Sequence, residues 1–321
     1  MRFHGLMLLR DEEDIIVQNL EHLLTWIDAL YILDLGSTDR TWDIVQDFAR
    51  RDPRVVPFMH RSILYDDNLR SFVFSHFRDR FSNGDWIFKI DADEFYHVPP
   101  PQFVRERLRP GESAVNLLWY YFRLTQAEVT AYETGAIDVM EDRNRPIELR
   151  RQFYQIAKYS EPRMFRYRRS MQWPEVTSFP YNAGFVARER IPIRHYPHRD
   201  PLQMARRYEL RASQMKLKAH AGPHWKLDDW HKDVIDPTSQ VAVAKTEGVS
   251  RMSGLDHDQV HQWLPGTQLP ELHPTDHLPG WKTRLAQRIV HPLLLPILDP
   301  RRRPFNNSYQ PTFIVDPSTN G

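Results

Sequence analysis

Short apolar segments alternate with amphipathic segments through the first hundred residues, and this alternation constrains the fold more than any other feature of the chain. Four apolar runs have the length of buried strands and cover residues 3–9, 29–33, 55–59 and 86–90. Three segments between them carry apolar side chains at helical spacing, at residues 14–26, 41–50 and 68–81. Because strands joined by crossover helices run parallel, the sequence predicts an α/β fold with a mainly parallel sheet flanked by helices.

The pattern changes after the three prolines at residues 99–101. The elements expected beyond them are an aromatic strand, a stretch of strands or loops and an amphipathic helix, at 113–122, 150–169 and 202–218. The remaining chain is rich in Trp, His and Pro and has weak periodicity. We therefore expect one α/β domain over residues 1–218 and an appended helical or irregular region over residues 219–321.

Composition and charge exclude several classes of function. The 321 residues include no cysteine, so the sequence carries neither a disulfide framework nor a thiolate metal site. A formal net charge of +1 gives no global attraction to nucleic acid, and we expect no nucleic acid partner. The lack of cysteine and of a signal-peptide pattern fits a cytoplasmic protein.

One late apolar segment raises the question of membrane contact. Ile289–Leu298 is interrupted by Pro292 and Pro296 and is much shorter than the ~20 residues that span a bilayer. Arg301–Arg303 follows it directly. Two interpretations stay open: a packed C-terminal segment with solvated arginines, or a peripheral contact with the anionic inner face of a membrane.

Two pairs of acidic residues follow predicted strands. Asp34 ends the second strand and Asp39 opens the next helix, whereas Asp91 and Asp93 come just after the fourth strand. In an open parallel sheet, ligands bind in the crevice at the carboxyl ends of the strands. We therefore expect both pairs to line one crevice.

The residue types suggest what that crevice binds. Two carboxylates spaced D-x-D can offer oxygens to one Mg²⁺ or Mn²⁺, which often completes its shell with substrate phosphates. Carboxylates at the other strand ends, Glu12, Asp34 and Asp39, can accept hydrogen bonds from a ribose hydroxyl or a base N–H. Each motif alone is weak evidence, because turns and helix caps use Asp constantly. Their succession after Arg10–Glu13, which closes the first strand, favours a binding site.

Three strings carry a family resemblance: M-L-L-R-D-E-E-D-I, Y-I-L-D-L-G-S-T-D-R-T and D-W-I-F-K-I-D-A-D-E-F. In this order they resemble the N-terminal signatures of family 2 glycosyltransferases with a GT-A fold, a Rossmann-like fold. The resemblance is strong over Met1–Phe95 and weak to about Ser213. It implies a nucleotide-binding half over residues 1–98, an acceptor half over residues 99–218, a nucleoside-diphosphate-sugar donor, Mn²⁺ or Mg²⁺, and inversion at the anomeric carbon.

The resemblance also assigns roles to the acidic residues. By match to the family motifs, Glu12, Asp34 and Asp39 would hold the nucleoside. Asp91 would contact the donor and the metal, with a catalytic role, and Asp93 would be the main protein ligand of the metal.

Other positions match the family less closely. Arg70 or Arg78, on the preceding helix, would face the diphosphate. Arg40 stands where a glycine commonly follows the second Asp of the nucleoside motif. The Q-x-x-R-W signature of processive synthases is absent, and the nearest string, Gln203–Arg207, lacks the Trp. Transfer of a single sugar therefore fits better than processive synthesis.

Inverting transfer needs a base that takes the proton of the acceptor hydroxyl. Glu175, in Q-W-P-E-V, lies at a family-like distance after D-A-D, and Asp228 and Asp229 are rivals. Glu175 also reads as a surface turn residue after Pro174.

A histidine and a basic stretch complete the candidate residues. His195, at the end of an apolar strand, is interpreted as a further metal ligand or a diphosphate contact, although a lone His is more often structural. The basic residues Lys158, Arg163, Arg166 and Arg168 would grip phosphates or form an exposed charged strand face.

The sequence thus predicts a metal-assisted glycosyltransferase that moves one sugar to a glycan, lipid-linked or small-molecule acceptor. A sugar-phosphate nucleotidyltransferase is an alternative, but Arg10–Glu13 stands where that class has a glycine-rich phosphate loop. A catalytically decayed carbohydrate-binding protein is a second alternative, and the intact Asp91 and Asp93 argue against it.

Overall fold

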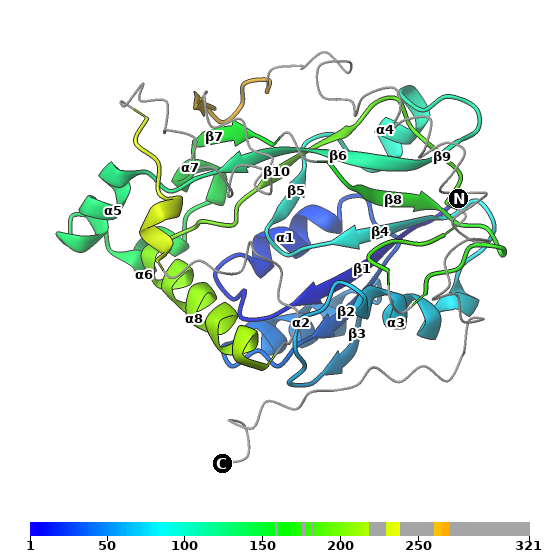
Figure 1. Cartoon of the computed structure of the whole chain (residues 1–321), viewed down its shortest axis with the longest axis horizontal. Helices are drawn as coiled ribbons and strands as arrows, with labels where there is room; N and C mark the ends of the chain where they lie inside the picture. Colours follow the sequence, from blue (N-terminus) through cyan, green and yellow to red (C-terminus); the bar gives the residue numbers. More distant parts are fainter. Residues whose placement is uncertain (158–159, 175–176, 182, 218–228, 238–259, 270–321) are drawn as a thin grey trace. The chain divides into compact units, whose positions relative to one another are not determined.

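The structure of the chain is a computed structural model (Figure 1). The chain divides into two compact units. The structure describes residues 1–157, 160–174, 177–181, 183–217, 229–237 and 260–269, without the side chains of residues 215–217. Within these residues the first unit comprises Met1–Leu117 and Glu161–Ile191, and the second comprises Leu118–Ser160 and the part of Pro192–Glu271 that is described.

The first unit is built on a mainly parallel sheet, as the alternation of the sequence predicts. Its four parallel strands are β1 (Phe3–Leu9), β2 (Ala29–Asp34), β3 (Val55–His60) and β4 (Trp86–Ile90), in the order β4-β1-β2-β3. Two of these strands match their predicted ranges, and the other two extend one residue further. Beyond β4 the sheet continues with β8 (Pro162–Arg166), antiparallel to β4, and with the start of β6 (Glu112–Phe122), antiparallel to β8.

Helices fill the connections between the parallel strands. They are α1 (Ile16–Leu23), α2 (Thr41–Arg51) and α3 (Leu69–His76), which is followed by the 3₁₀ turn η1 (Arg78–Arg80). A further helix, α4 (Pro100–Glu106), comes after the last parallel strand. All three predicted helices are present, but α1 and α3 are shorter than expected. The two short strands β5 (Glu94–Tyr96) and β9 (Phe185–Val186) and helix α4 were not predicted, since each is too short to show a period.

All seven residues of β1 are buried. Leu6 and Leu8 belong to a core that includes Leu69, Val73 and Phe74 of α3. A central strand of a parallel sheet is buried on both faces, which explains why this segment is continuously apolar rather than alternating.

The second unit is smaller and more helical. Its strands are the end of β6, β7 (Phe153–Ile156), β10 (Ile191–His195, from Pro192 onward) and β11 (His261–Gln262), and β7 pairs antiparallel with both β6 and β11. Its helices are α5 (Gln126–Glu133), α6 (Val139–Arg143), α7 (Ile147–Arg150), α8 (Pro201–Leu217) and the 3₁₀ turn η3 (Trp230–Asp233). The strand expected at 113–122 and the helix expected at 202–218 are confirmed within one residue at each end.

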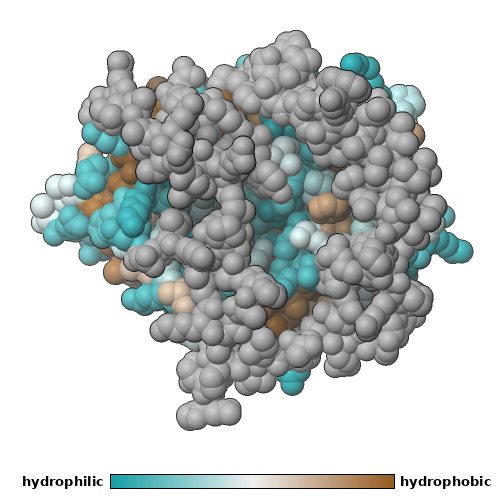
Figure 2. Space-filling model, in the orientation of Figure 1, coloured by the Kyte–Doolittle hydropathy of each residue, from teal (hydrophilic) through white to brown (hydrophobic). Residues whose placement is uncertain are grey.

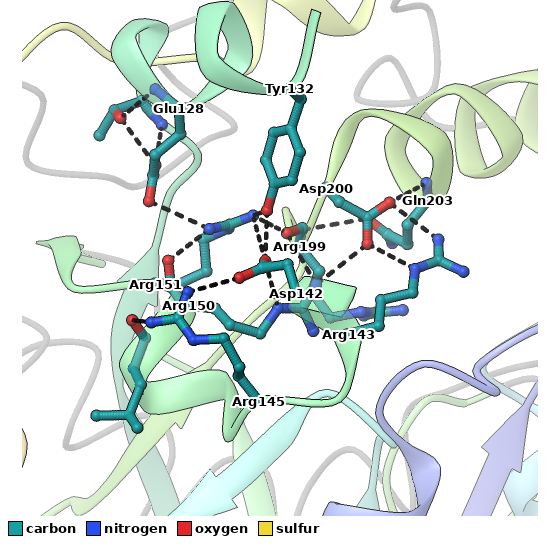
Figure 3. Close-up of polar contacts among 12 residues, drawn as sticks. Glu128, Tyr132, Asp142, Arg143, Arg145, Arg150, Arg151, Arg199, Asp200 and Gln203 are labelled. Atoms are coloured by element: carbon teal, nitrogen blue, oxygen red, sulfur yellow. Dashed lines mark hydrogen bonds and ion pairs between the residues drawn. The ribbon is translucent and has the colours of Figure 1, made fainter. Parts of the chain in front are cut away.

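Buried ion pairs join the helices of the second unit (Figure 3). Arg150 donates from Nε to Asp142 at 2.9 Å and from Nη2 to Asp200 at 3.2 Å. Arg143 also donates to Asp200, at 2.9 and 3.0 Å. Because Asp200 immediately precedes α8, these contacts tie α6 and α7 to the start of that helix.

The surface is mixed in character. On the face drawn in Figure 2, most of the coloured surface is hydrophilic and hydrophobic residues form smaller separate areas. The large exposed hydrophobic side chains are scattered along the chain, at Met1, Val17, Met140, Leu149, Phe185, Leu202 and Leu264. In the described part of the chain, no helix combines the length and the apolar character needed to cross a bilayer.

Several expectations concern residues that the structure does not describe. The domain boundary expected at residue 218 falls in the undescribed segment 218–228, so the appended region stays a prediction. Ile289–Leu298 and Arg301–Arg303, considered for membrane contact, also lie outside the described residues.

Gly5 gives a test of how tightly β1 is packed. A methyl group added at Gly5 would lie 2.6 Å from Cδ1 of Ile90 and of Leu30, and 2.8 Å from Cδ1 of Ile27. Because overpacking a buried core costs about 1–3 kcal/mol, Gly5→Ala should lower the free energy of unfolding by that amount in a urea titration. Adding Ile90→Val removes one clashing methyl group, so the double variant should be more stable than the sum of the two single effects. Additive losses would contradict the packing seen here.

Candidate active site

The loops that follow β1 and β2 are hydrogen-bonded to each other. The N–H of Asp11 donates to Ser37 Oγ at 2.9 Å, and the N–H of Thr38 donates to Asp11 Oδ1 at 2.7 Å. The N–H of Glu12 donates to Thr41 Oγ1 at 2.8 Å. Asp11 has a φ of 57°, a left-handed conformation that costs free energy for a residue other than glycine. The first two predicted motifs therefore meet at the carboxyl edge of the sheet.

Asp34, the last residue of β2, is fully buried. Its Oδ1 accepts hydrogen bonds from the N–H groups of Gly36 at 2.8 Å and Ser37 at 2.7 Å, and lies 3.0 Å from Nδ1 of His60. Its Oδ2 is shielded from water and has no hydrogen-bond partner among the described residues. Burial raises the pKa of the Asp34 carboxyl, and the hydrogen bonds from Ser37 only partly oppose this.

His60 is a site residue that the sequence reasoning missed. It ends β3 and stacks on Trp42 of α2, with ring centroids 5.3 Å apart and an interplanar angle of 25°. The His60 side chain is 38% exposed, so the stacked pair reaches the surface beside Asp34. The available signal was its position at the end of a third parallel strand, where ligand contacts gather.

Asp39 holds the two loops together. Its Oδ1 accepts from the N–H of Thr41 at 2.9 Å and from Thr41 Oγ1 at 2.5 Å, and its Oδ2 accepts from the N–H of Glu13 at 3.3 Å. The N-cap of α2 is Arg40, so Asp39 stands one residue before the position that a capping role requires. Both oxygens of Asp39 therefore have protein donors, unlike Oδ2 of Asp34.

Charged side chains gather where β4 ends, and we call this group the β4 charge cluster. It consists of five carboxylates and three cations: Asp67, Asp91, Asp93, Glu94, Glu161, Arg70, Lys89 and Arg163. The formal charges leave an excess of two negative charges. Buried charges are costly unless they are paired, so this cluster is held by mutual attraction.

Asp91 lies between two arginines. Its Oδ1 accepts from the buried Arg70, and its Oδ2 accepts from Nη1 of Arg163 at 2.9 Å. Burial alone would raise the pKa of Asp91, but Arg163 and Arg70 outweigh it, and the pKa of Asp91 is lowered. Asp91 therefore stays ionised in spite of its neighbour Asp93.

Lys89 is an unexpected member of the cluster, because it lies within an otherwise apolar strand. Its side chain is fully buried, and its Nζ lies 2.8 Å from Asp67 Oδ2 and 3.5 Å from Glu161 Oε1. Burial lowers the pKa of Lys89, as expected for an ammonium group removed from water. The pKa of Asp67 is nevertheless lowered, because Arg70 and Lys89 outweigh its desolvation.

Arg163 links the cluster to β8. Besides Asp91, it pairs with Glu94 at 3.3 Å and with Glu161 at 2.5 Å. The residues of the predicted basic stretch therefore have different surroundings. Arg163 is buried, whereas Arg166 and Arg168 are exposed. Lys158, the fourth residue of that stretch, lies outside the described residues.

The two arginines considered for the diphosphate have other contacts here. Arg70 is fully buried and pairs with Asp67 and Asp91. Arg78 donates from Nη2 to the carbonyl oxygens of Arg169 at 2.7 Å and Met171 at 2.9 Å. Their contact with a donor stays a prediction.

The fit of a divalent metal depends mainly on Asp93. Both oxygens of Asp91 accept from arginines, whereas Asp93 is a buried carboxylate beside it whose charge raises the pKa of Asp91. Among the described residues no group of three or more His, Asp or Glu side chains converges as a metal site. A metal at this position would therefore have Asp93 as its protein ligand and take other ligands from substrate phosphates, which suits Mg²⁺ and Mn²⁺.

The remaining candidates belong elsewhere. His195 lies in the second unit, where its ring is 4.9 Å from that of Tyr121 and 6.2 Å from that of Trp119. Asp229 is in the same unit, half exposed, and accepts from the N–H of His231 at 3.0 Å. Glu175 and Asp228 lie outside the described residues, so the position of the base stays a prediction.

Comparisons with known proteins leave the family open. No family model and no curated protein matches the chain. Among solved structures, residues 1–349 of S. aureus TarS in complex with UDP-GlcNAc match with a TM-score of 0.29 and 16% identity, over 38% of this chain and 34% of that one. The mannosyltransferase PcManGT from Pyrobaculum calidifontis, in complex with GDP-Man and Mn²⁺, matches with a TM-score of 0.28 and 14% identity. This match covers 36% of this chain and 35% of that one.

A third similar structure has a different activity. The CTP:phosphocholine cytidylyltransferase LicC from Streptococcus pneumoniae matches with a TM-score of 0.24 and 12% identity, over 39% of this chain and 60% of that one. The matched region spans only about a third of the length of TarS and PcManGT. At these scores and identities, the likenesses decide neither the family nor the activity of this chain.

The β4 charge cluster can be tested with a matched pair of variants on β8. Arg163→Gln leaves Asp91, Glu94 and Glu161 without their shared cation, and breaking a buried ion pair costs about 3–5 kcal/mol. Arg166→Gln makes the same change at an exposed position of the same strand and should shift stability by less than about 0.5 kcal/mol. Urea unfolding of both variants measures the difference. Equal losses would show that the cluster does not hold the sheet.

Proposed function

We propose that this protein is a glycosyltransferase that transfers one sugar from a nucleoside-diphosphate-sugar, with a divalent metal and with inversion, as in the GT-A glycosyltransferases of family 2. The observation that carries the proposal is the unpartnered Oδ2 of Asp34, at the edge of the sheet where β4 also ends in acidic residues. A buried acceptor without a donor costs free energy, so a ligand N–H or O–H would stabilise it.

In this proposal the nucleoside lies against the ends of β1, β2 and β3. Asp34 accepts a hydrogen bond from the base or ribose, and the exposed face of the His60 and Trp42 pair offers a surface on which a base can stack. Since Asp34 Oδ2 is shielded from water, a ligand reaches it only if the groups that cover this atom move. Glu12 and Asp39 complete the loop pair on which the nucleoside would rest.

The diphosphate lies at the end of β4. The two excess negative charges of the β4 charge cluster attract a divalent cation, which Asp93 would hold together with diphosphate oxygens. The metal, when bound, neutralises charge that develops on the leaving diphosphate. Arg70 and Arg163 fix the Asp91 carboxylate at the reacting end of the site.

The acceptor hydroxyl needs a base on the side opposite the leaving group, and we assign this role to Glu175. The acceptor is a glycan, a lipid-linked sugar or a small molecule. Release of a nucleoside diphosphate from a nucleotide sugar separates this activity from nucleotidyl transfer, in which inorganic pyrophosphate is released. A panel of nucleotide sugars would identify the donor.

The nucleoside contact is tested by Asp34→Asn. The amide keeps the oxygen that accepts from Gly36 and Ser37 but loses the second acceptor, so affinity for a nucleoside diphosphate should fall about ten- to a hundredfold. Because burial penalises the Asp34 charge, the melting temperature should hold or rise.

Asp39→Asn is the comparison variant. Its carboxylate accepts from both loops, so Asp39→Asn should weaken nucleotide binding together with some loss of stability. Calorimetry with UDP and with GDP measures the nucleotide affinity of each variant. Unchanged affinity in Asp34→Asn would remove Asp34 from the nucleotide site.

The metal role is tested by Asp93→Asn. Removing one carboxylate from a cluster with excess negative charge should leave stability unchanged or raise it, while Mn²⁺-dependent hydrolysis of the nucleotide sugar should be abolished. Thermal melting without metal and hydrolysis across a Mn²⁺ series give the two measurements. Full activity in Asp93→Asn at low Mn²⁺ would contradict the assignment.

A further inference from the structure

The second unit contains a group of basic side chains that the proposed function has not yet used. The group surrounds the end of β10 and one side of α8, and we call it the α8 basic cluster: Arg123, His195, His198, Arg207 and Arg211. Among the described residues, Asp233 is the carboxylate whose contacts with this cluster are resolved. Asp233 lies 3.3 Å from Nη1 of Arg123 and 3.6 Å from Nε2 of His198, and accepts a hydrogen bond from Tyr208.

Arg211 is the member of this cluster with the least compensation. It lies one helical turn after Arg207, on the same side of α8, and is partly buried. It forms no ion pair and no side-chain hydrogen bond with the residues that the structure describes. Burial and the neighbouring Arg207 lower the pKa of Arg211 to about 10, so it remains charged at neutral pH, and among the described residues Asp233 is the carboxylate that opposes this lowering.

An unused hydrogen-bond donor also indicates that this cluster can bind an anion. Arg123 is 5% exposed, and its Nε has no hydrogen-bond partner in the described part of the chain. Its guanidinium lies 4.9 Å from the ring centre of Tyr121, which also contacts the rings of His195 at 4.9 Å and His198 at 5.5 Å. Tyr121, His195, Arg207 and Arg211 are all partly exposed, so a ligand can reach the cluster.

The sign of this charge decides between the two roles considered for His195. A metal cation at His195 would be repelled by Arg123, Arg207 and Arg211, and in the described part of the chain Asp233 would oppose that repulsion. A phosphate group would be attracted, and guanidinium groups bind phosphate through charge-assisted hydrogen bonds. The cluster therefore suits an anion.

We infer that the α8 basic cluster binds a phosphate group carried by the acceptor, which would make the acceptor a phosphorylated molecule. This inference rests on the proposed function, because it defines the substrate class of the same reaction. The donor diphosphate is the other source of the same chemistry. Every residue proposed for the donor belongs to the first unit, where the metal supplies the positive charge, so we assign the α8 cluster to the second substrate.

Calorimetry with the full chain tests this assignment with inorganic phosphate as the probe. Arg211→Gln should weaken phosphate binding about tenfold, the lower part of the range for a lost hydrogen bond to a charged group. Arg188→Gln is the control, because it makes the same charge change at an exposed residue of the first unit. It should leave phosphate affinity unchanged. Arg211→Lys keeps the charge and should lose less affinity than Arg211→Gln.

A second titration identifies the source of the phosphate. With UDP or GDP and Mn²⁺ at saturation, wild-type protein should still bind phosphate, and Arg211→Gln should bind the nucleotide as tightly as wild type. Displacement of phosphate by the nucleotide, or weaker nucleotide binding by Arg211→Gln, would overturn the acceptor assignment in favour of the donor. Equal phosphate affinity in wild type and a folded Arg211→Gln, checked by thermal melting, would overturn the site itself. Failure of wild type to bind UDP or GDP would count against the proposed function. The titration with inorganic phosphate would still test whether the α8 basic cluster binds phosphate.

Discussion

The burial of charge at the end of β4 is the constraint on which the first unit depends. Lys89 and Arg70 have no exposed side-chain surface, and such cations are tolerated only when carboxylates replace their lost hydration. Those carboxylates come from distant parts of the sequence, including Asp67 before α3 and Glu161 before β8. The sheet order β8-β4-β1 is therefore supported by electrostatics as well as by apolar packing.

This arrangement gives the site its rigidity. Asp91 is held by arginines from α3 and β8, so its position is set by two elements rather than by the flexible end of one strand. The loops after β1 and β2 are fixed in a similar way, through Asp11 and Asp39. Much of the acidic character of the motifs thus serves to build the site, whereas Asp34 Oδ2 has no hydrogen-bond partner among the described residues. The Asp91 carboxylate in particular is preorganised, and a group held in this way loses little entropy when a substrate binds.

The sequence predicts the sheet well because its signals are local. The range of β1 follows from seven consecutive apolar residues, and Asp34 and Asp91 were found because each directly follows such a run. Lys89 was not found, and Arg163 was named only as a phosphate contact or an exposed strand residue, not as a buried partner of Asp91. Lys89 lies inside an apolar strand, and Arg163 lies 72 residues after its partner Asp91, so only the folded sheet brings their charges together. The spacing of apolar residues along the sequence does not predict an ion pair between residues so far apart.

The two units differ in the sign of their unbalanced charge, and this difference suits a reaction between two phosphate-bearing substrates. Such substrates repel each other, and the repulsion grows as water is excluded between them. In the first unit the excess negative charge of the β4 cluster suits a metal-bound diphosphate, whose cation is attracted to the carboxylates. In the second unit the excess positive charge around Arg211 suits a phosphate without a metal. If both sites had the same sign, one substrate would bind poorly or the two would compete for one site. In the proposed reaction, opposite signs would let each unit select its own substrate.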